Sequence, residues 1–289
     1  MSVSISVAKN KGILYVVATP IGNLDDMTPR AVDVLKSVDK IAAEDTRHSL
    51  RLLKHFGIST PCFSYHDHVE RQLSGAIVEK IENGETIALI SDAGTPLISD
   101  PGYHLVKLAQ QRNIKVVPVP GPSALITALS ASGLASDRFI FEGYLPAKTT
   151  ARQKKLSSLL EEPRTLIFYE SPHRIVAALS DLLNVFGPQR QAVIARELTK
   201  TYETIKSDTI DELYQWVLAD RNQQKGEFVI LLAGDAVDKS DQEIESETKR
   251  ILLLLLEELP VKQAAALAAK ISGVKKNILY QYALKQMAE

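Results

Sequence analysis

The sequence predicts an α/β protein built of two α/β domains and a small helical C-terminal domain. Short β-branched runs alternate with helical patterns as far as residue 235, and beyond it the pattern is only helical. Strands separated by helices in this way are typical of βαβ units with mostly parallel sheets. A length of 289 residues fits about two domains with a small appendage.

The strands are predicted from short apolar runs that are bounded by turn residues. They are expected at Ile13–Ala18, Lys40–Ala43, Pro61–Tyr65, Thr86–Ser91, Lys115–Val119, Arg138–Gly143, Thr165–Tyr169, Gln191–Glu197 and Glu227–Leu232. Helical patterns fill most of the segments between them. The sheets are therefore expected to follow the chain in βα alternation.

Several helix ends are marked by local residues. Thr28-Pro29 and Asp100-Pro101 each place an N-cap residue before a proline at the first helical position, where a missing N–H is harmless. Asn83-Gly84 is predicted as a turn, and Gly133 and Gly187 as helix stops.

The proline-rich segment Val116–Pro122 interrupts the alternation near the middle of the chain. Proline cannot donate to a sheet ladder, so a domain boundary is expected here. The acidic, polar stretch after Gly234 is predicted as a linker. We therefore expect domains at residues 1–120 and 121–235, followed by a linker and helical domain at 236–289. The first twelve residues lack a signal peptide's apolar stretch and are predicted as a flexible arm.

Composition excludes several classes of protein and site. A net charge of −1 excludes the globally basic profile of many nucleic-acid binders, although not a local basic patch. Cys62 is the only cysteine, which excludes an internal disulfide and a thiolate zinc cluster. The longest aliphatic run, Ile251–Leu256, is too short to span a bilayer. The chain is predicted to be soluble and cytoplasmic.

Three loops at strand ends are candidates for ligand binding: Ala18–Asp26, Ser91–Gly102 and Pro118–Ala124. Open α/β sheets bind ligands at the carboxyl ends of their strands. None of the loops fits GxGxxG or carries a P-loop lysine, so neither phosphate-binding motif is present. Ordinary turns and a rigid interdomain connection are the alternative readings. The length and polarity of Ser91–Gly102 favour a functional loop.

Three other strand ends pair a carboxylate with an arginine: Glu44–Ser49, Tyr169–Arg174 and Arg196–Lys200. Surface ion pairs are the usual explanation of such mixtures, but three recurrences favour a shared cleft. The HDH sequence at His66–His68 is more typical of a solvated loop than of a metal site.

Two basic stretches stand out on this neutral chain. Tyr144–Lys155 carries four positive charges and no acid, and Pro260–Ala288 carries five lysines and no acid. Within the second stretch, the spacing of Ala269, Gly273, Val274 and Leu279 fits a helix-turn-helix, with a plain helical hairpin as the competitor. Basic stretches of this kind indicate phosphate backbones as partners.

The chain resembles the tetrapyrrole-methylase-like superfamily of S-adenosylmethionine-dependent methyltransferases, and within it the bacterial ribosomal RNA small-subunit methyltransferase I family. The motifs that carry the resemblance, in order, are ATPIGNLDDMTPRA, AEDTRHS, LISDAGTPLISDPG, VPGPSA, FYESPHR and ARELTKTYE. The resemblance covers almost everything from Gly12 to the C-terminus, with Ala18 where many relatives have glycine.

The resemblance implies two α/β domains of the tetrapyrrole-methylase type, usually in a homodimer, with S-adenosylmethionine bound in the cleft between the domains. It also implies 2′-O-methylation of a cytidine ribose in the decoding region of 16S rRNA, on the assembled small subunit. By position, the implied donor-binding residues are Pro20, Gly22, Asp92, Ala93, Gly94, Thr95, Ser99, Ser123, Ala124, Tyr169, Ala195 and Gly226.

A ribose hydroxyl is a poor nucleophile, so a general base or a strong hydrogen-bond acceptor is expected. The candidates are Glu44, Asp45, Glu170 and Glu197, and the sequence does not choose among them. The candidate RNA-binding residues are Arg47, His173, Arg174, Arg196, Lys148, Arg152, Lys154, Lys155, Lys275 and Lys276. No metal is expected. Two alternatives remain, a tetrapyrrole or precorrin C-methyltransferase and a non-enzymatic nucleic-acid-binding regulator.

Overall fold

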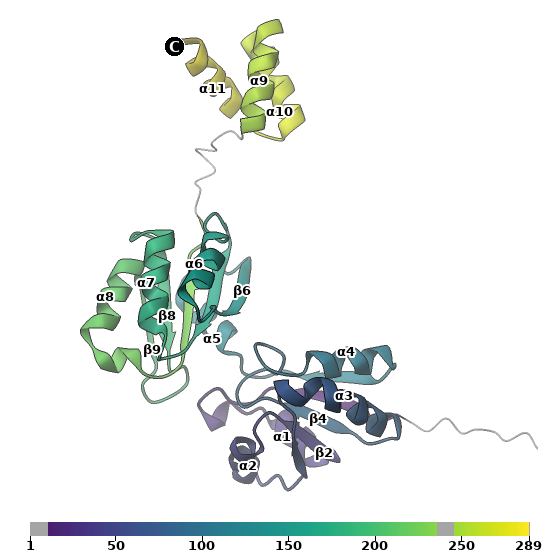
Figure 1. Ribbon diagram of the computed structural model, residues 1–289. Coiled ribbons are helices and arrows are strands. Elements are labelled where there is room, and N and C mark those ends of the chain that lie inside the picture. The colour runs from purple at the N-terminus through teal and green to yellow at the C-terminus, as the bar shows by residue number, and fades with distance from the viewer. Residues whose placement is uncertain (1–10, 236–245, 289) are drawn as a thin grey trace, which may run out of the picture. The chain divides into compact units, whose positions relative to one another are not determined.

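The computed structural model describes residues 11–235 and 246–288, in two compact units that span Met1–Gly234 and Asp235–Glu289. The first unit holds two five-stranded sheets with their helices (Figure 1). Both sheets lie within this unit, so the expected division near residue 120 stays a prediction. The expected arm and linker fall almost wholly on residues 1–10 and 236–245, outside the described residues.

The first sheet is entirely parallel, in the order β3-β2-β4-β1-β5. Its strands are β1 (Ile13–Val17), β2 (Lys40–Ala43), β3 (Cys62–Ser64), β4 (Ile87–Ile90) and β5 (Lys115–Val119). One hydrophobic core lies between the sheet and helices α1 (Pro29–Ser37) and α2 (Thr46–His55), and a second between it and α3 (Asp67–Glu82) and α4 (Tyr103–Gln111). Every residue of β4 is buried because helices cover both faces.

The proline-rich segment begins inside this sheet. Pro118 lies in β5, which pairs only with β1 and so forms one edge of the sheet. An edge strand tolerates proline because one side of it carries no ladder. The same proline signal that favours a domain boundary therefore also marks the sheet edge.

The second sheet is mixed, in the order β6-β7-β10-β8-β9. Its strands are β6 (Phe139–Tyr144), β7 (Thr165–Glu170), β8 (Gln191–Arg196), β9 (Thr204–Thr209) and β10 (Phe228–Leu232). Only β6 and β7 are parallel neighbours, whereas β10 and β9 run antiparallel to the strands that they pair with. The expectation of mostly parallel sheets is therefore wrong for this sheet.

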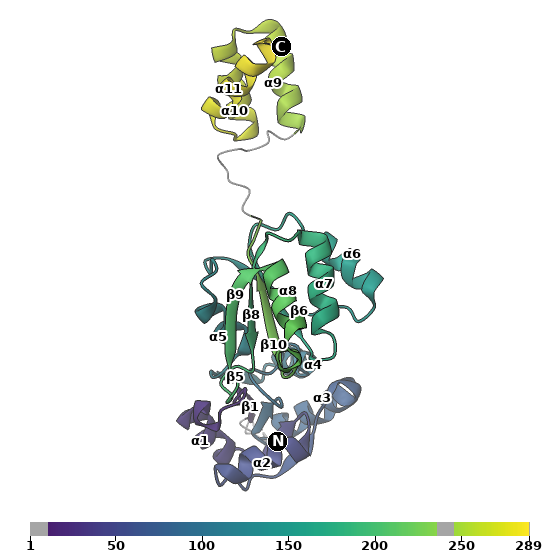
Figure 2. The same cartoon turned by 90° about the vertical axis from the view of Figure 1, so that its left-hand side faces the viewer.

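Helices cover both faces of the second sheet. α5 (Ala124–Ser132) packs on one face, and α6 (Thr149–Ser157), α7 (Ile175–Phe186) and α8 (Ile210–Ala219) pack on the other (Figure 2). Two 3₁₀ turns lie at Leu24–Asp26 and Arg221–Gln224. Among the strands of the described residues, β9 is the one that the sequence analysis misses. It is a polar edge strand, TIKSDT, that pairs only with β8, so it lacks the apolar run of a buried strand.

Most of the predicted helix ends are confirmed. The Thr28 hydroxyl accepts a hydrogen bond from the Ala31 N–H at 3.2 Å and caps α1. Gly133 and Gly187 end α5 and α7 with φ of +74° and +82°, a conformation that favours glycine.

The predicted helix start at Asp100-Pro101 is wrong. Helix α4 begins at Tyr103, and the buried Glu70 carboxylate accepts the N–H groups of Gly102 and His104, each at 2.9 Å. A distant carboxylate thus caps this helix in place of a local side chain, and Asp100 is left to face a cavity.

Glu70→Ala is expected to lower the free energy of unfolding by about 1–3 kcal/mol, because the N–H groups of Gly102 and His104 lose their acceptor. Glu70→Gln keeps an acceptor oxygen and should retain most of the stability. Urea unfolding of the two variants and the wild type measures the difference. Equal stability of Glu70→Ala and the wild type would show that water replaces the carboxylate at no cost.

The second unit is a three-helix cluster of α9 (Ser246–Glu258), α10 (Val261–Ser272) and α11 (Lys276–Ala288). Leu252, Ala264, Ala268, Leu279 and Ala283 form its buried core. Gly273 ends α10 with φ of +75°, and the chain then turns into α11. The predicted turn and its buried Leu279 anchor are confirmed.

Candidate functional site

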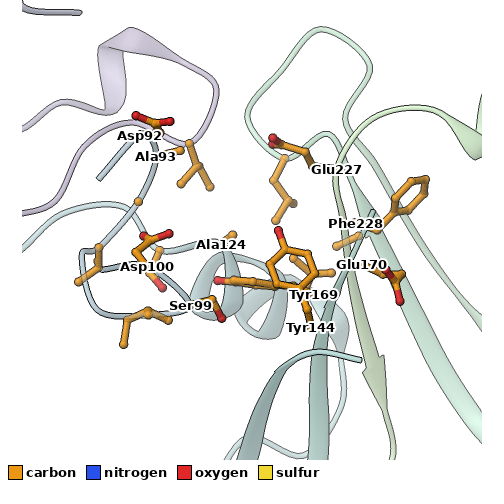
Figure 3. A pocket seen from close by; sticks show the side chains of 18 of the residues that line it. Asp92, Ala93, Ser99, Asp100, Ala124, Tyr144, Tyr169, Glu170, Glu227 and Phe228 are labelled. Atoms are coloured by element: carbon orange, nitrogen blue, oxygen red, sulfur yellow. The ribbon is translucent and has the colours of Figure 1, made fainter. Parts of the chain in front are cut away.

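The main cavity of the first unit has a volume of about 260 Å³ and receives side chains from both halves of that unit (Figure 3). The loop after β4 and the start of α5 line one side, and the ends of β6, β7 and β8 and the start of β10 line the other. Its lining comprises Ile21, Glu44, Asp92, Ala93, Gly94, Thr95, Ile98, Ser99, Asp100, Ser123, Ala124, Tyr144, Tyr169, Glu170, Ala195, Leu198, Glu227, Phe228 and Val229.

The loop after β4 is held rigidly at the cavity. Gly94 and Thr19 exchange two backbone hydrogen bonds, at 2.8 and 3.0 Å, and the Thr95 hydroxyl donates to the Pro122 carbonyl at 3.0 Å. Ser99, which lines the cavity, and nearby Leu97 adopt positive φ angles of 66° and 74°. Non-glycine residues take this conformation only where the surroundings enforce it, and such strain concentrates at functional sites.

One wall of the cavity is acidic. Glu44, Asp92 and Asp100 line it, and none of the three forms an ion pair with another described residue. The backbone N–H of Asp45 donates to Asp92 Oδ1 at 3.0 Å, and that of Asp92 donates to Glu44 Oε2 at 3.4 Å. These bonds hold the first two carboxylates side by side.

The pKa values of two carboxyl groups on this wall, those of Asp100 and Glu44, are raised. Burial is the main cause for Asp100, whose pKa rises to about 7 with a further contribution from the charges of Glu44 and Asp92. Burial also raises the pKa of Glu44. A group that titrates near neutral pH in a cavity is a candidate for acid–base chemistry, and unpaired carboxylates attract a cationic ligand.

The opposite wall is aromatic. Tyr169 packs edge-to-face against Phe141 and Tyr144, with ring centroids 4.8 and 5.7 Å away. Its hydroxyl accepts a hydrogen bond from the Leu125 N–H at 3.1 Å, in the first turn of α5. Burial raises the pKa of Tyr169 to about 12, so the phenol stays protonated and neutral.

A second cavity of about 360 Å³, the α2 groove, adjoins the first and shares Ile21, Asp92, Ala93 and Glu227 with it. Its lining comprises Pro20, Ile21, Gly22, Leu24, His48, Arg51, Leu52, Asp92, Ala93, Lys200 and Glu227. Gly22 is packed so closely that a Cβ there would lie 2.5 Å from Lys200 Cγ and 2.7 Å from Thr199 Oγ1. Glycine is therefore required at this position for the contact between the two halves of the unit.

Nine of the twelve predicted donor-binding residues line the main cavity: Asp92, Ala93, Gly94, Thr95, Ser99, Ser123, Ala124, Tyr169 and Ala195. Pro20 and Gly22 line the α2 groove instead. Gly226 lines neither cavity, and a Cβ there would collide with the Glu197 carboxylate at 2.5 Å.

The cavity residues Asp100, Tyr144, Glu227 and Val229 were not predicted from the sequence as site residues. Asp100 lies within the motif SDAGTPLISDPG, but its position before Pro101 resembles a helix cap. Tyr144 ends a strand at the start of the basic stretch Tyr144–Lys155 and is half exposed. Only the packing of the two halves brings these residues together.

The four candidate general bases differ in environment. Asp45 forms an ion pair with Arg47 at 2.8 Å, and hydrogen bonds from Arg47 lower its pKa to about 2. Burial would raise the pKa of Glu197, but hydrogen bonds from the Glu227 N–H and from Lys200 lower it overall. Both carboxylates are weak bases as a result, and neither lines the main cavity.

Glu170 and Glu44 do line the main cavity. The Glu170 side chain is fully buried and forms an ion pair with Arg174 at 3.0 Å. Arg174 also donates to the Leu145 carbonyl. Glu44 has no such partner and remains the candidate that best fits the role expected of the predicted set.

Two of the predicted RNA contacts are wrong. Arg152 is 2% exposed and its Nε lies 2.6 Å from Asp181 Oδ2, while Arg196 is 7% exposed and donates to the carbonyls of Lys225 and Tyr202. Buried guanidinium groups with these partners do not reach a phosphate. The side chain of Arg47 is 88% exposed, and His173, Lys148, Lys154, Lys275 and Lys276 are exposed too. Lys155 is half-exposed and paired with Glu142.

Among the described residues, no group of three His, Cys, Asp or Glu side chains is arranged to hold a metal ion. Within the same residues, no helix is both long and apolar enough to cross a membrane.

Comparison with known proteins gives two family matches. Residues 13–214 match the family described as Tetrapyrrole (Corrin/Porphyrin) Methylases, and residues 242–287 match the RsmI C-terminal HTH domain. The first match lies within the first compact unit and the second match within the second unit.

Curated relatives match over almost the whole chain. A protein from Pseudomonas aeruginosa named Ribosomal RNA small subunit methyltransferase I is 59% identical over 96% of this chain and 99% of its own length. A protein of the same name from Vibrio cholerae is 56% identical over 96% of both chains.

A solved structure with the same fold is uroporphyrin-III C-methyltransferase from Thermus thermophilus complexed with S-adenosylhomocysteine. The likeness has a TM-score of 0.53 at 18% identity and covers 78% of this chain and 99% of the other.

Proposed function

This chain belongs to the tetrapyrrole methylase family, and from that premise we propose that it methylates ribosomal RNA of the small subunit, using S-adenosylmethionine as the methyl donor. The observation that carries the proposal is the likeness to relatives named for this activity over both units, at 59% and 56% identity. The 18% identity to a small-molecule methylase carries the fold alone.

The cavity residues fit the chemistry of this donor. S-adenosylmethionine supplies an electrophilic methyl group on a positively charged sulfur. Glu44, Asp92 and Asp100 form an acidic wall that lacks a cationic partner among the described residues. The apolar residues Ile21, Leu198 and Val229 offer a surface for an adenine ring. N–H groups where α5 begins, apart from that of Leu125, which donates to Tyr169, suit the donor's own carboxylate.

The proposed acceptor is the ribose 2′-hydroxyl of a cytidine in the decoding region of 16S rRNA, on the assembled subunit. Such a hydroxyl needs a group that accepts its proton as the oxygen attacks. Asp100 fits this role because it lines the cavity and its pKa is about 7. Glu44, on the same wall with a raised pKa, is the second candidate. The remaining cavity residues orient the reactants, and positioning alone supplies much of the rate.

The protein residues that contact the RNA are also part of the proposal. The exposed cations Arg47, Lys148, Lys154, Lys275 and Lys276 are available to phosphates. A homodimer, also expected from the family resemblance, belongs to the same proposal. The second unit is proposed to contact RNA through its lysines.

Transfer of radiolabelled methyl groups by the purified protein tests the proposal. The substrates are small subunits from a strain that lacks the gene, naked 16S rRNA and a mixture of tetrapyrroles. Label on subunit RNA, mapped to a cytidine ribose, is the expected result. Label only on tetrapyrrole would contradict the proposed RNA substrate but agree with S-adenosylmethionine as the methyl donor. If the protein neither transfers methyl groups nor binds the donor, the alternative of a non-enzymatic nucleic-acid-binding regulator would be favoured.

A further inference from the structure

We propose that the basic face of α2 and the adjoining α2 groove bind the RNA strand that flanks the target nucleotide. This inference rests on the proposed function, because it names the surface by which the same active site holds its substrate.

Helix α2 carries cations on one face and no acid. Its residues Thr46–His55 include the basic side chains Arg47, His48, Arg51, Lys54 and His55. At 3.6 residues per turn these five side chains fall within about 120° of the helix circumference. The buried residues Ser49 and Leu53 lie on the opposite side, so the basic face points to solvent.

The charges on this face are largely unneutralised. Arg47 pairs with Asp45 at 2.8 Å, but its side chain remains 88% exposed. Arg51 and Lys54 are exposed and make no ion pair with another described residue. A solvated helix face usually mixes both signs, whereas a face of one sign fits a polyanion.

The basic face lies next to the main cavity, which indicates that the polyanion it binds is the substrate. His48 and Arg51 line the α2 groove, and the groove shares Ile21, Asp92 and Glu227 with the main cavity. Through His48 and Arg51, helix α2 (labelled in Figure 1) therefore adjoins the cavity where methyl transfer is proposed.

The charge changes sign along this path, which sets the direction of the bound strand. The groove carries His48 and Arg51, and the lining that it shares with the main cavity carries Asp92 as well as Glu227, whose charge is neutralised by Lys200 at 2.9 Å. Carboxylates repel phosphates, so phosphates are held outside, over α2. Leu24 and Leu52 also line the groove and provide an apolar surface that suits a nucleobase. The sugar of one nucleotide then extends to the acidic wall.

The test uses Arg51→Ala/Lys54→Ala in the full chain. Its matched control is Lys80→Ala/Lys107→Ala, which removes two exposed cations from α3 and α4, on the opposite face of the first sheet. Binding to a 16S rRNA transcript and to small subunits is measured between 50 and 300 mM salt. Calorimetric binding of S-adenosylmethionine confirms that the donor site of each variant is intact.

The α2 variant should bind RNA about 20-fold more weakly at 0.15 M salt, and its log–log salt slope should be shallower by about 1.5, since each lost phosphate contact removes roughly 0.7–0.9. Donor affinity should not change, and the control should match the wild type. An unchanged slope and affinity in the α2 variant would overturn the proposed surface. Equal losses in variant and control would also overturn it, in favour of a general charge effect.

Methyl transfer separates this inference from the proposed function. If wild-type protein binds RNA through α2 but transfers label only to tetrapyrroles, the surface stands and the proposed function fails. If wild-type protein methylates subunit RNA and the α2 variant does so with unchanged KM and kcat, the function stands and the surface fails.

Discussion

Asp100→Asn is expected to lower kcat/KM for methyl transfer by about 100-fold to 10,000-fold, the usual range for loss of a general base. Asp100 lines the main cavity on the wall that also holds Glu44 and Asp92. Asparagine is similar in size and polar, so the cavity keeps its shape while it loses the proton acceptor. Asp137→Asn is the control because its carboxylate is 80% exposed at the surface.

The pH profile distinguishes this role from a structural one. Burial raises the pKa of Asp100 to about 7, so wild-type kcat/KM should rise with pH through about 7 and then level. The residual activity of the variant should lack this step. Wild-type rates in Asp100→Asn at every pH would remove Asp100 from the chemistry and leave Glu44 as the base.

The contribution of Asp100 to the stability of the fold should fall as pH rises, whereas its contribution to activity increases. A carboxyl group whose folded pKa lies above its unfolded value of about 3.9 stabilises the fold at low pH, and this contribution is lost as pH rises through about 7. Asparagine removes the ionisation, so Asp100→Asn should be at least as stable as the wild type at pH 8. A marked loss of stability at pH 8 would instead indicate a structural defect.

Arg152→Ala is expected to lower the free energy of unfolding by about 3–5 kcal/mol, the range for breaking a buried ion pair. Arg152 on α6 and Asp181 on α7 are 2% and 4% exposed, with Nε and Oδ2 2.6 Å apart. Gln153 donates to the other carboxylate oxygen at 2.7 Å and alone does not neutralise the charge. Alanine therefore leaves a buried, unpaired carboxylate, and denaturant unfolding measures the loss.

Two comparisons show whether charge or volume is responsible. Lys154→Ala removes an exposed cation from the same helix and should leave stability unchanged. Arg152→Met/Asp181→Leu removes both charges and should be more stable than Arg152→Met alone, because no carboxylate is stranded. If the double variant is the less stable of the two, packing and not charge dominates at this site.

Helices and strands are predicted well from the sequence wherever neighbouring residues determine them. The strand at Lys40–Ala43 and the helix cap at Thr28 follow from neighbouring residues and are confirmed. Strand β9 is missed because an edge strand that pairs on one side needs no apolar run. The helix start at Asp100 is wrong because Glu70, thirty residues away, caps α4 instead.

The candidate site divides in the same way. The motif order and the glycine- and proline-rich loops were readable in the chain, since a strand followed by a tight loop marks its own ligand-binding end. Nine predicted donor residues therefore line one cavity. The roles of charged residues were not readable, because Arg152 looks like any exposed arginine in a basic stretch until its burial is known.

By itself, the sequence determined the α/β class, most strands and helix ends, the helical C-terminal unit and the loops that form the cavity. The tertiary structure alone decided the antiparallel pairing of the second sheet, the burial of Arg152 and Arg196, and the acidic wall that includes Asp100. The physical reason is the distance along the chain over which each interaction acts. Backbone preferences act between neighbouring residues, whereas burial and the pKa of a carboxyl group depend on side chains that folding brings together from distant parts of the chain.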